Sequence, residues 1–494
     1  MTVDLTQLGG KFSELRGTQA DILASLISTD NKVMMAEAPT GIGKSLIALG
    51  LHQLLRSKFT VVSTGTISLQ EQYTRDFPTA TALLGRRNFV CERNGLSAAE
   101  APCTIDNSLD CASAYHEQER AYWKSACVIT NYALFASELL HGSRWINRRP
   151  ELLVCDEGHR LLDYLTEAEA VEIDCTLAEK LGLKVGELVS LAQAKGWAKV
   201  NIKGIKGRAT AEIMAGSKRA GMWMSMLRQV TSVIEADPNL IVTRKGKYFK
   251  AVPLWPKSSA TAMTESADKI LIMSATLYGG EFLAGLLGID DYYYTSAESP
   301  FPTDSWPVYY RPVATMNKRA GAQAWVTMGD ECHRYMHDEP ESGAIHVASF
   351  KQAELIARRI LMCAQCRRRL IVQKMGETRN DTLKQFRAQE GAWIVHPSIG
   401  EGESFDDELC RVQLIAKIPF PDLGDALVKL RAADSELGQR FYFHSTAAKV
   451  VQIVGRGMRH QDDHCRTYIL DNSFGMLYDK NRTAFPPWFQ RQLR

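Results

Sequence analysis

Residues 33–50 read VMMAEAPTGIGKSLIALG and combine a short apolar run, a glycine-containing loop and a longer apolar run. The first run predicts a buried strand and the second a helix. Between them, Gly41 and Gly43 offer backbone N–H groups at a helix N-terminus, Lys44 supplies a cation and Ser45 a hydroxyl. Those groups cradle a phosphate chain with its Mg²⁺, so the stretch predicts a phosphate-binding loop between a strand and a helix.

The loop follows the usual phosphate-binding pattern except at its first position, where Ala38 replaces glycine. The alternative is a glycine turn before an ordinary helix, which would need strand, loop and helix to fall in register by chance. The residues expected to contact nucleotide are Pro39, Thr40, Gly41, Ile42, Gly43, Lys44 and Ser45.

A second apolar run ends in two carboxylates about 110 residues further on, in ELLVCDEGH at 151–159. Asp156 is suited to hold the Mg²⁺ shell together with Ser45, and Glu157 to polarise an attacking water. An Asp-Glu pair at a strand end is weak evidence alone. Combined with the phosphate-binding loop, it predicts a nucleotide hydrolase and argues against a simple kinase of the same loop type.

Composition excludes several other classes of protein. With 494 residues and 45% hydrophobic side chains, the chain has enough material for about three globular domains. No apolar run reaches the roughly 18 residues of a membrane helix and no secretory leader is visible, so we expect a cytoplasmic protein without a membrane partner. Eleven cysteines, several within apolar runs, do not suggest a disulfide scaffold.

Short β-branched runs alternate with helical stretches, which predicts an α/β fold with mostly parallel sheet. The runs form two groups, and the proline-rich residues 299–312 are interpreted as the linker between them. The expected strands cover 33–36, 60–63, 126–130, 152–155, 270–273, 344–348, 392–396, 412–416 and 467–470.

Two segments interrupt the first group. Residues 85–126 carry spaced cysteines, and residues 163–253 look largely helical. Ten Lys or Arg against three acidic residues lie within 201–250, whereas the whole chain carries a formal charge of only +3. This basic stretch suggests a phosphate-contacting surface, with a solvated helical face as the alternative.

A third motif, STAAKVVQIVGRGMR at 445–459, predicts a helix with Gln452, Arg456 and Arg459 on one face. A guanidinium suits the charge that develops in phosphoryl transfer, so we expect arginine fingers lent by the second group of strands. Read in isolation, the same pattern would describe a surface salt-bridge helix.

Together these motifs resemble superfamily 2 helicases, and others narrow the resemblance to the DinG/XPD branch. Arg16 and Gln19 lie in LRGTQ at 15–19, which resembles the motif on the adenine side of the nucleotide. The remaining motifs are STGTISLQ at 63–70, GRRNFVC at 85–91, TNYAL at 130–134, MSATL at 273–277, SF at 349–350, EGESFD at 401–406 and KIPFP at 417–421.

The resemblance implies two RecA-like motor domains, at 1–84, 127–162 and 254–298 and at 299–494. It places a cysteine-bearing insert at 85–126 and a helical arch at 163–253. It further implies ATP-dependent 5′-to-3′ movement on single-stranded DNA and forked duplex, with ATP and Mg²⁺ required and His159 coupling hydrolysis to movement. The expected DNA contacts are Thr64, Gly65, Ser349, Ser404 and, in the basic arch, Arg219 and Lys245.

The cysteines depart from the family pattern, in which four thiolates of the insert hold an iron–sulfur cluster. Here the insert offers Cys91, Cys103 and Cys111, because Cys127 already belongs to an expected strand. We therefore expect a vestigial insert without a cluster, and a bound cluster or another metal is the alternative. The CAQC run at 363–366 has no second pair of ligands at zinc spacing, so its cysteines are interpreted as unrelated thiols.

An incomplete cysteine set and the lack of a nuclease-like extension resemble the DinG proteins encoded beside type IV-A CRISPR systems. The resemblance implies a CRISPR ribonucleoprotein complex as partner. The alternative function is a DNA-stimulated ATPase or translocase that remodels protein–nucleic acid complexes without separating strands. A decayed motor that acts as a scaffold is disfavoured, because Lys44, Asp156, Glu157 and Arg459 are all in place.

Overall fold

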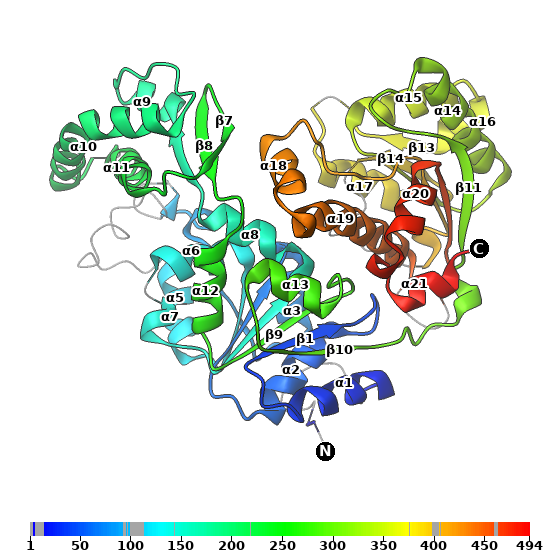
Figure 1. Cartoon of the computed structure of the whole chain (residues 1–494), viewed down its shortest axis with the longest axis horizontal. Coiled ribbons are helices and arrows are strands. Elements are labelled where there is room, and N and C mark those ends of the chain that lie inside the picture. The colour runs from blue at the N-terminus through cyan, green and yellow to red at the C-terminus, as the bar shows by residue number, and fades with distance from the viewer. Residues whose placement is uncertain are drawn as a thin grey trace.

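The computed structural model contains two parallel sheets and one small antiparallel sheet, as Figure 1 shows. Within the described ranges, no helix combines the length and apolarity that a membrane crossing requires. The residues described are 3–4, 14–91, 95, 97–98, 113–142, 144–217, 219–374, 376–397, 405, 407–458 and 463–494.

The first sheet has seven parallel strands, and alternate side chains of each strand enter two different cores, as expected for a sheet buried on both faces. Its strands, in spatial order, are β10 (Tyr292–Ser296), β1 (Val33–Glu37), β9 (Lys269–Ser274), β5 (Leu152–Asp156), β2 (Thr60–Thr64), β4 (Cys127–Asn131) and β3 (Thr81–Ala82).

Helices cover both faces of this sheet. One face carries α1 (Gly17–Ile27), α2 (Lys44–Leu54) and α3 (Ile67–Asp76). The opposite face carries α5 (Ala114–Lys124), α6 (Tyr132–His141), α7 (Arg144–Asn147), α8 (Leu161–Ala168), α12 (Lys257–Glu265) and α13 (Gly280–Leu287).

The second sheet has six parallel strands and is also sandwiched between helices. Its strands, in order, are β11 (Val308–Ala314), β16 (Arg466–Asp471), β15 (Val412–Ile415), β12 (Gly343–His346), β14 (Trp393–His396) and β13 (Leu370–Val372). One face carries α14 (Ala322–Asp338), α15 (Phe350–Ile360) and α16 (Ala364–Arg369); the other carries α19 (Glu436–Val454), α20 (Ser473–Lys480) and α21 (Pro487–Gln492). Two further helices are α17 (Arg379–Ala388) and α18 (Ala426–Asp434).

The α/β fold with two parallel sheets is confirmed, and each of the nine expected strands forms. The interpretation of 299–312 as a plain linker was wrong in part, because β11 begins within it at Val308. This strand lies at the sheet edge, and its register shifts between Tyr310 and Ala314. Pro312 lacks an N–H, so it is tolerated in such an edge strand although it reads as a strand breaker in the sequence.

Residues 163–253, which the sequence predicts to be largely helical, contain three strands as well as helices. They contain α9 (Cys175–Lys180), α10 (Leu191–Met214) and α11 (Ala220–Glu235), which pack on an antiparallel sheet of β6 (Val171–Asp174), β8 (Tyr248–Val252) and β7 (Ile241–Arg244). Figure 1 shows this unit standing apart from the sheet that carries β1. Leu161, Leu162 and Leu165 of α8 are instead buried in the core of the first sheet.

Candidate active site

The residues expected to handle a nucleotide meet at one edge of the first sheet. The phosphate-binding loop follows β1, Ser274 ends β9 and Asp156 ends β5, and these three strands are paired in parallel. Parallel strands present their carboxyl ends at the same edge, where ligands of α/β folds bind. The fold therefore brings together groups that are more than 200 residues apart in sequence.

Arg16 and Gln19 hold the phosphate-binding loop in place. The Arg16 guanidinium donates to the carbonyl oxygen of Gly41 at 2.8 Å, and the buried Gln19 amide donates to that of Ile42 at 2.7 Å. Gly41 and Gly43 adopt φ of 76° and 85°, a left-handed conformation that suits glycine. The polar motif of α1 thus fixes the shape of the loop through its carbonyl groups.

Asp156, which is buried, and the partly exposed Glu157 form an acidic pair at the end of β5. The hydroxyl of Tyr73 donates to Asp156 Oδ2 at 2.9 Å, and the backbone N–H of Glu157 donates to Oδ1 at 2.9 Å. Glu157 adopts φ of 58°, an uncommon conformation for a non-glycine residue. Its Oε1 lies 4.0 Å from Lys44 Nζ, so the predicted base and the predicted phosphate cation face each other.

His159 links this acidic pair to β9. Its Nδ1 lies 2.8 Å from Ser274 Oγ and 3.3 Å from Glu157 Oε2. Ser274 belongs to the MSATL motif, whose Thr276 contacts the second domain. A movement at Glu157 therefore has a continuous polar route to the end of β9.

The oxygen donors present fit a magnesium ion. Burial, and then the charge of Glu157, raise the pKa of Asp156 to about 6, whereas Lys44 and the Tyr73 hydroxyl lower it. The Thr40 Oγ1 atom is buried and has no hydrogen-bond partner among the described residues. A carboxylate and the hydroxyl of Ser45 are ligands that Mg²⁺ accepts, and the bound ion would favour the charged form of Asp156.

Tyr73→Phe tests the electrostatics of this pair. Because the hydroxyl stabilises charged Asp156, its removal should raise the carboxyl pKa further and move the acidic limb of nucleotide hydrolysis upward by about one pH unit, since one unit equals about 1.4 kcal/mol. The rate at pH 8 should change little. The measurement is a pH–rate profile from pH 5 to 9.

Tyr132→Phe is the matched control, because Tyr132 is fully buried under the same sheet and its hydroxyl interacts with the Cys155 thiol and makes no hydrogen bond to Asp156. Its profile should match the unmodified protein. An unshifted acidic limb in Tyr73→Phe would remove Asp156 as the group that titrates there.

The second sheet reaches the phosphate-binding loop through the end of α19. Gln452 Nε2 donates to Thr276 Oγ1 at 3.4 Å. A side chain at Gly455 would place its Cβ 2.4 Å from Thr40 Oγ1, so the two domains meet directly at the loop. This contact explains why glycine follows a helix that could otherwise continue.

The expectation of one helix through 445–459 was wrong at its end. The α-helix ends at Val454, and Gly455–Gly457 form a 3₁₀ turn, so Arg456 lies in that turn and not in the helix that carries Gln452. Arg456 lies near the end of β12, where burial and the charge of this arginine lower the pKa of His346 to about 4. Arg459 lies outside the described residues.

Gly455→Ala tests the contact between the domains. The backbone at Gly455 is right-handed helical, so only the lack of space opposes the new methyl group. We expect at least a tenfold loss of nucleotide turnover without a change in melting temperature. Gly285→Ala is the control, because its Cβ would meet Leu437 of α19 at an ordinary 3.9 Å. Normal turnover in Gly455→Ala would contradict a contact needed for hydrolysis.

A cavity of about 1550 Å³ opens beside the nucleotide edge and is lined by the first domain, the insert and the arch. Gly65 and Ile67 border it, and Arg86, Arg87 and Arg228 enter it from the insert and α11. Burial lowers the pKa of Arg228, and the charges of Arg86 and Arg87 lower it further. These three arginines, together with Arg144 in ion pairs with Glu119 and Glu138, face a space large enough for an anionic chain.

The DNA-contact residues expected from sequence lie in different places. Gly65 lines the cavity, whereas the Thr64 hydroxyl is buried and donates to the carbonyl oxygens of Thr66 and Thr130. Ser349 caps α15 in the second domain. Arg219 and Lys245 are exposed on the arch, and Ser404 lies outside the described residues.

Arg86 and Arg87 were not expected as DNA contacts. Arg86 and Arg87 are adjacent in GRRNFVC, and this pair of cations next to an insert was the signal available. Arg228 belongs to the basic stretch at 201–250 that suggested a phosphate-contacting surface, but only the fold turns it toward the insert.

Of the insert cysteines, Cys91 is a buried free thiol, whereas Cys103 and Cys111 lie outside the described residues. Cys363 and Cys366, interpreted from sequence as unrelated thiols, have ligand atoms within 4.8 Å of those of His333 and His337. The backbone N–H of Cys366 and then the two imidazoles lower the pKa of Cys363 to about 6. The missed signal is the H-x₃-H spacing in α14, about 26 residues before the first cysteine.

Two domain families match the chain. Residues 12–183 match the type III restriction enzyme res subunit, and residues 332–492 match the helicase C-terminal domain. The ATP-dependent DNA helicase DinG of Escherichia coli K12 is 35% identical over 106 residues, which is 18% of this chain and 14% of DinG. The ATP-dependent DNA helicase CHL1 of Vanderwaltozyma polyspora is 27% identical over 116 residues, which is 20% of this chain and 14% of CHL1.

Two solved structures have the same fold over nearly the whole chain. A structure described as an XPD helicase has a TM-score of 0.68 at 16% identity and covers 96% of this chain and 98% of its own. The structure of S. tokodaii Xpd4 has a TM-score of 0.65 at 15% identity, and the match covers 97% of this chain and 99% of Xpd4.

The two parallel-sheet domains therefore have the fold of these XPD structures, with two RecA-like domains. The matched segments span only about a seventh of the lengths of DinG and of this CHL1.

Proposed function

We propose that this protein is an ATP-dependent DNA helicase that moves 5′ to 3′ on single-stranded DNA. The observation that carries the proposal is the continuous contact from Lys44 through Glu157 and His159 to Ser274, together with the Gln452–Thr276 hydrogen bond to the second domain. The MSATL motif contributes Ser274 to the hydrolysis site and Thr276 to the domain interface, so hydrolysis could be coupled to movement of the domains. The 5′-to-3′ direction rests on the DinG/XPD resemblance.

The residues divide the hydrolytic work between them. Lys44 and the loop N–H groups would bind the phosphates, and Glu157 would orient and polarise the attacking water. Ser45 and Asp156 would hold Mg²⁺, which neutralises phosphate charge when bound. Arg456 and Arg459 would act from the second domain, so loss of the γ-phosphate would weaken the interface and let the domains part.

The cavity bordered by Gly65, Arg86 and Arg228 is the proposed track for the strand. Its arginines are suited to phosphates, whose recognition does not depend on base sequence. Trp123 and Tyr164 also line it and offer aromatic faces on which bases could stack. The proposal thus places the DNA between the first domain, the insert and the arch.

Glu157→Gln with partial duplexes tests the motor. We expect the unmodified protein with ATP and Mg²⁺ to open a duplex with a 5′ single-stranded tail and leave a 3′-tailed duplex closed. Glu157→Gln should lose at least a hundredfold in ATP hydrolysis, the scale of a lost catalytic base, while still binding single-stranded DNA. Glu235→Gln, at an exposed glutamate of α11, is the control and should behave as the unmodified protein.

Two other outcomes would change the proposal. If neither duplex opens although DNA stimulates hydrolysis, and streptavidin is displaced from a biotinylated strand, the protein is a translocase that remodels complexes without strand separation. Full hydrolysis by Glu157→Gln would overturn the role of Glu157.

Alanine substitution of Arg228 tests the track. If Arg228 contacts a phosphate, Arg228→Ala should weaken binding of single-stranded DNA several-fold and reduce the slope of log affinity against log salt by about 0.7. Lys245→Ala is the matched comparison, because Lys245 is a cation of the same arch but exposed and not part of the cavity. A larger change of slope in Lys245→Ala would move the DNA to the outer surface of the arch.

We also propose a CRISPR ribonucleoprotein complex as the partner that opens DNA for this motor. The support is the set of three cysteines in the insert, which resembles type IV-A DinG proteins. The strand-separation assay tests this partner directly, with a target duplex opened by a purified type IV-A complex in place of the tailed duplex. No gain over a non-target duplex would reject it.

A further inference from the structure

Four metal-binding side chains meet on the outer face of the second sheet, outside the site described above. His333 and His337 are four residues apart on α14, so they project from one face of that helix. Cys363 directly precedes α16, and Cys366 lies within the first turn of that helix. Ligand atoms of all four lie within 4.8 Å of one another.

The spacing of these atoms suits a tetrahedral zinc ion. With Zn–S of about 2.3 Å and Zn–N of about 2.0 Å, neighbouring ligand atoms around zinc lie about 3.3–3.8 Å apart. His337 Nδ1 lies 3.7 Å from the Sγ atoms of both Cys363 and Cys366. Two thiolates with two imidazoles form a donor set typical of structural zinc.

The hydrogen bonds between His337 and the two thiols do not satisfy the whole cluster. Cys363 and Cys366 are free thiols, so no disulfide brings them together. His333 Nε2 is buried without a hydrogen-bond partner in the described part of the chain, which is costly for a polar atom. A metal ion would satisfy the nitrogens and the sulfurs at once.

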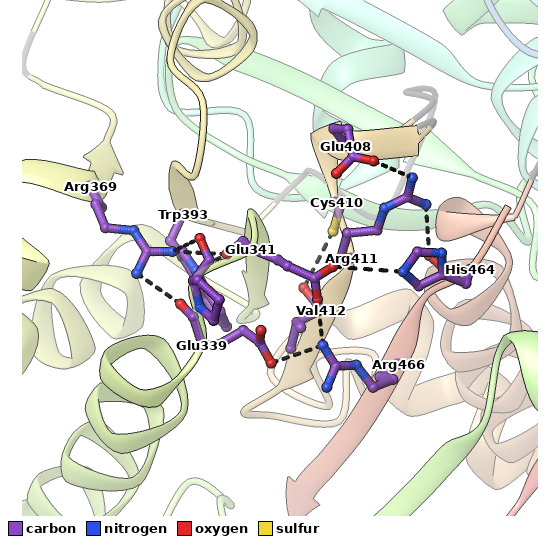
Figure 2. A network of polar contacts seen from close by, with 11 residues as sticks. Glu339, Glu341, Arg369, Trp393, Glu408, Cys410, Arg411, Val412, His464 and Arg466 are labelled. Carbon is purple, nitrogen blue, oxygen red and sulfur yellow. Dashed lines mark hydrogen bonds and ion pairs between the residues drawn. The ribbon is translucent and has the colours of Figure 1, made fainter.

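Arg369 holds the two halves of the cluster at a fixed distance without any metal. It extends from the end of α16 and donates to the carbonyl oxygens of Met336 at 3.1 Å and Glu339 at 2.8 Å, at the end of α14. Figure 2 shows Arg369 directed at this segment, with Arg466 contacting Glu339 and Glu341 from another side. The cluster is thus built on a braced pair of helices, as a preformed metal site requires.

We propose that His333, His337, Cys363 and Cys366 bind a structural zinc ion that ties α14 to α16. The two helices pack on one face of the second sheet, whereas α19, which reaches the phosphate-binding loop, packs on the other. The ion therefore stabilises the domain and takes no part in hydrolysis. All four positions are filled by protein ligands, which is typical of structural zinc and leaves no position for substrate.

Metal analysis of the purified full chain tests this site. We expect about one zinc per chain and, after exchange with Co²⁺, the visible absorption of a tetrahedral ion together with a thiolate charge-transfer band. Cys363→Ser and His337→Ala should each lose at least tenfold in zinc occupancy. A chelator should lower the melting temperature of the unmodified chain and leave that of Cys363→Ser unchanged.

Cys91→Ser is the matched control, because Cys91 is the described cysteine of the insert and an alternative source of metal ligands. It should retain zinc and the cobalt spectrum. Zinc lost in Cys91→Ser but kept in Cys363→Ser would place the metal in the insert and overturn the proposal. Absence of both zinc and a cobalt spectrum from folded, unmodified protein would also overturn it; circular dichroism of both variants checks folding.

Discussion

Parallel pairing of β1, β9 and β5 is the constraint on which the site depends. Each strand ends in a different functional group, namely the phosphate-binding loop, Ser274 and Asp156, and parallel hydrogen bonding brings all three to one edge. An antiparallel arrangement would send one of them to the far side of the sheet. Burial of the strands on both faces then makes this edge rigid, so that a carboxylate can be held in a dry environment beside Lys44.

The second domain packs against this edge of the first sheet at Gly455, which has no side chain. Gly455 approaches Thr40 so closely that no Cβ fits between them, and Gln452 bonds to Thr276 beside it. The shape of the nucleotide site is therefore completed by a segment more than 400 residues away in sequence from the loop. Because the two domains touch at the phosphate-binding loop, a nucleotide bound to that loop would change how easily the domains separate.

The sequence predicts well what depends on local pattern. Buried parallel strands read as continuous apolar runs, and the groups at their ends follow from strand direction. Features that depend on tertiary contact were not visible. Residues 299–312 were interpreted as a linker because the edge position of β11 is a property of the sheet, and the close approach of Gly455 to Thr40 is a contact between domains. His333 and Cys363 come from separate helices, so only their packing brings them together.

Helix α3 joins two sites that have been described separately. Ile67 at its start borders the arginine-lined cavity, and Tyr73, less than two turns later, bonds to Asp156. If bound DNA moves α3, the hydrogen bond from Tyr73 to Asp156 changes, and with it the charge of this carboxylate. A change at Asp156 would act in turn on the bound DNA. By thermodynamic reciprocity, the factor by which an occupied track alters nucleotide affinity equals the factor by which nucleotide alters affinity for the track. On the proposed function, one short helix would therefore couple DNA binding in the cavity to nucleotide binding beside Asp156 through a single coupling free energy.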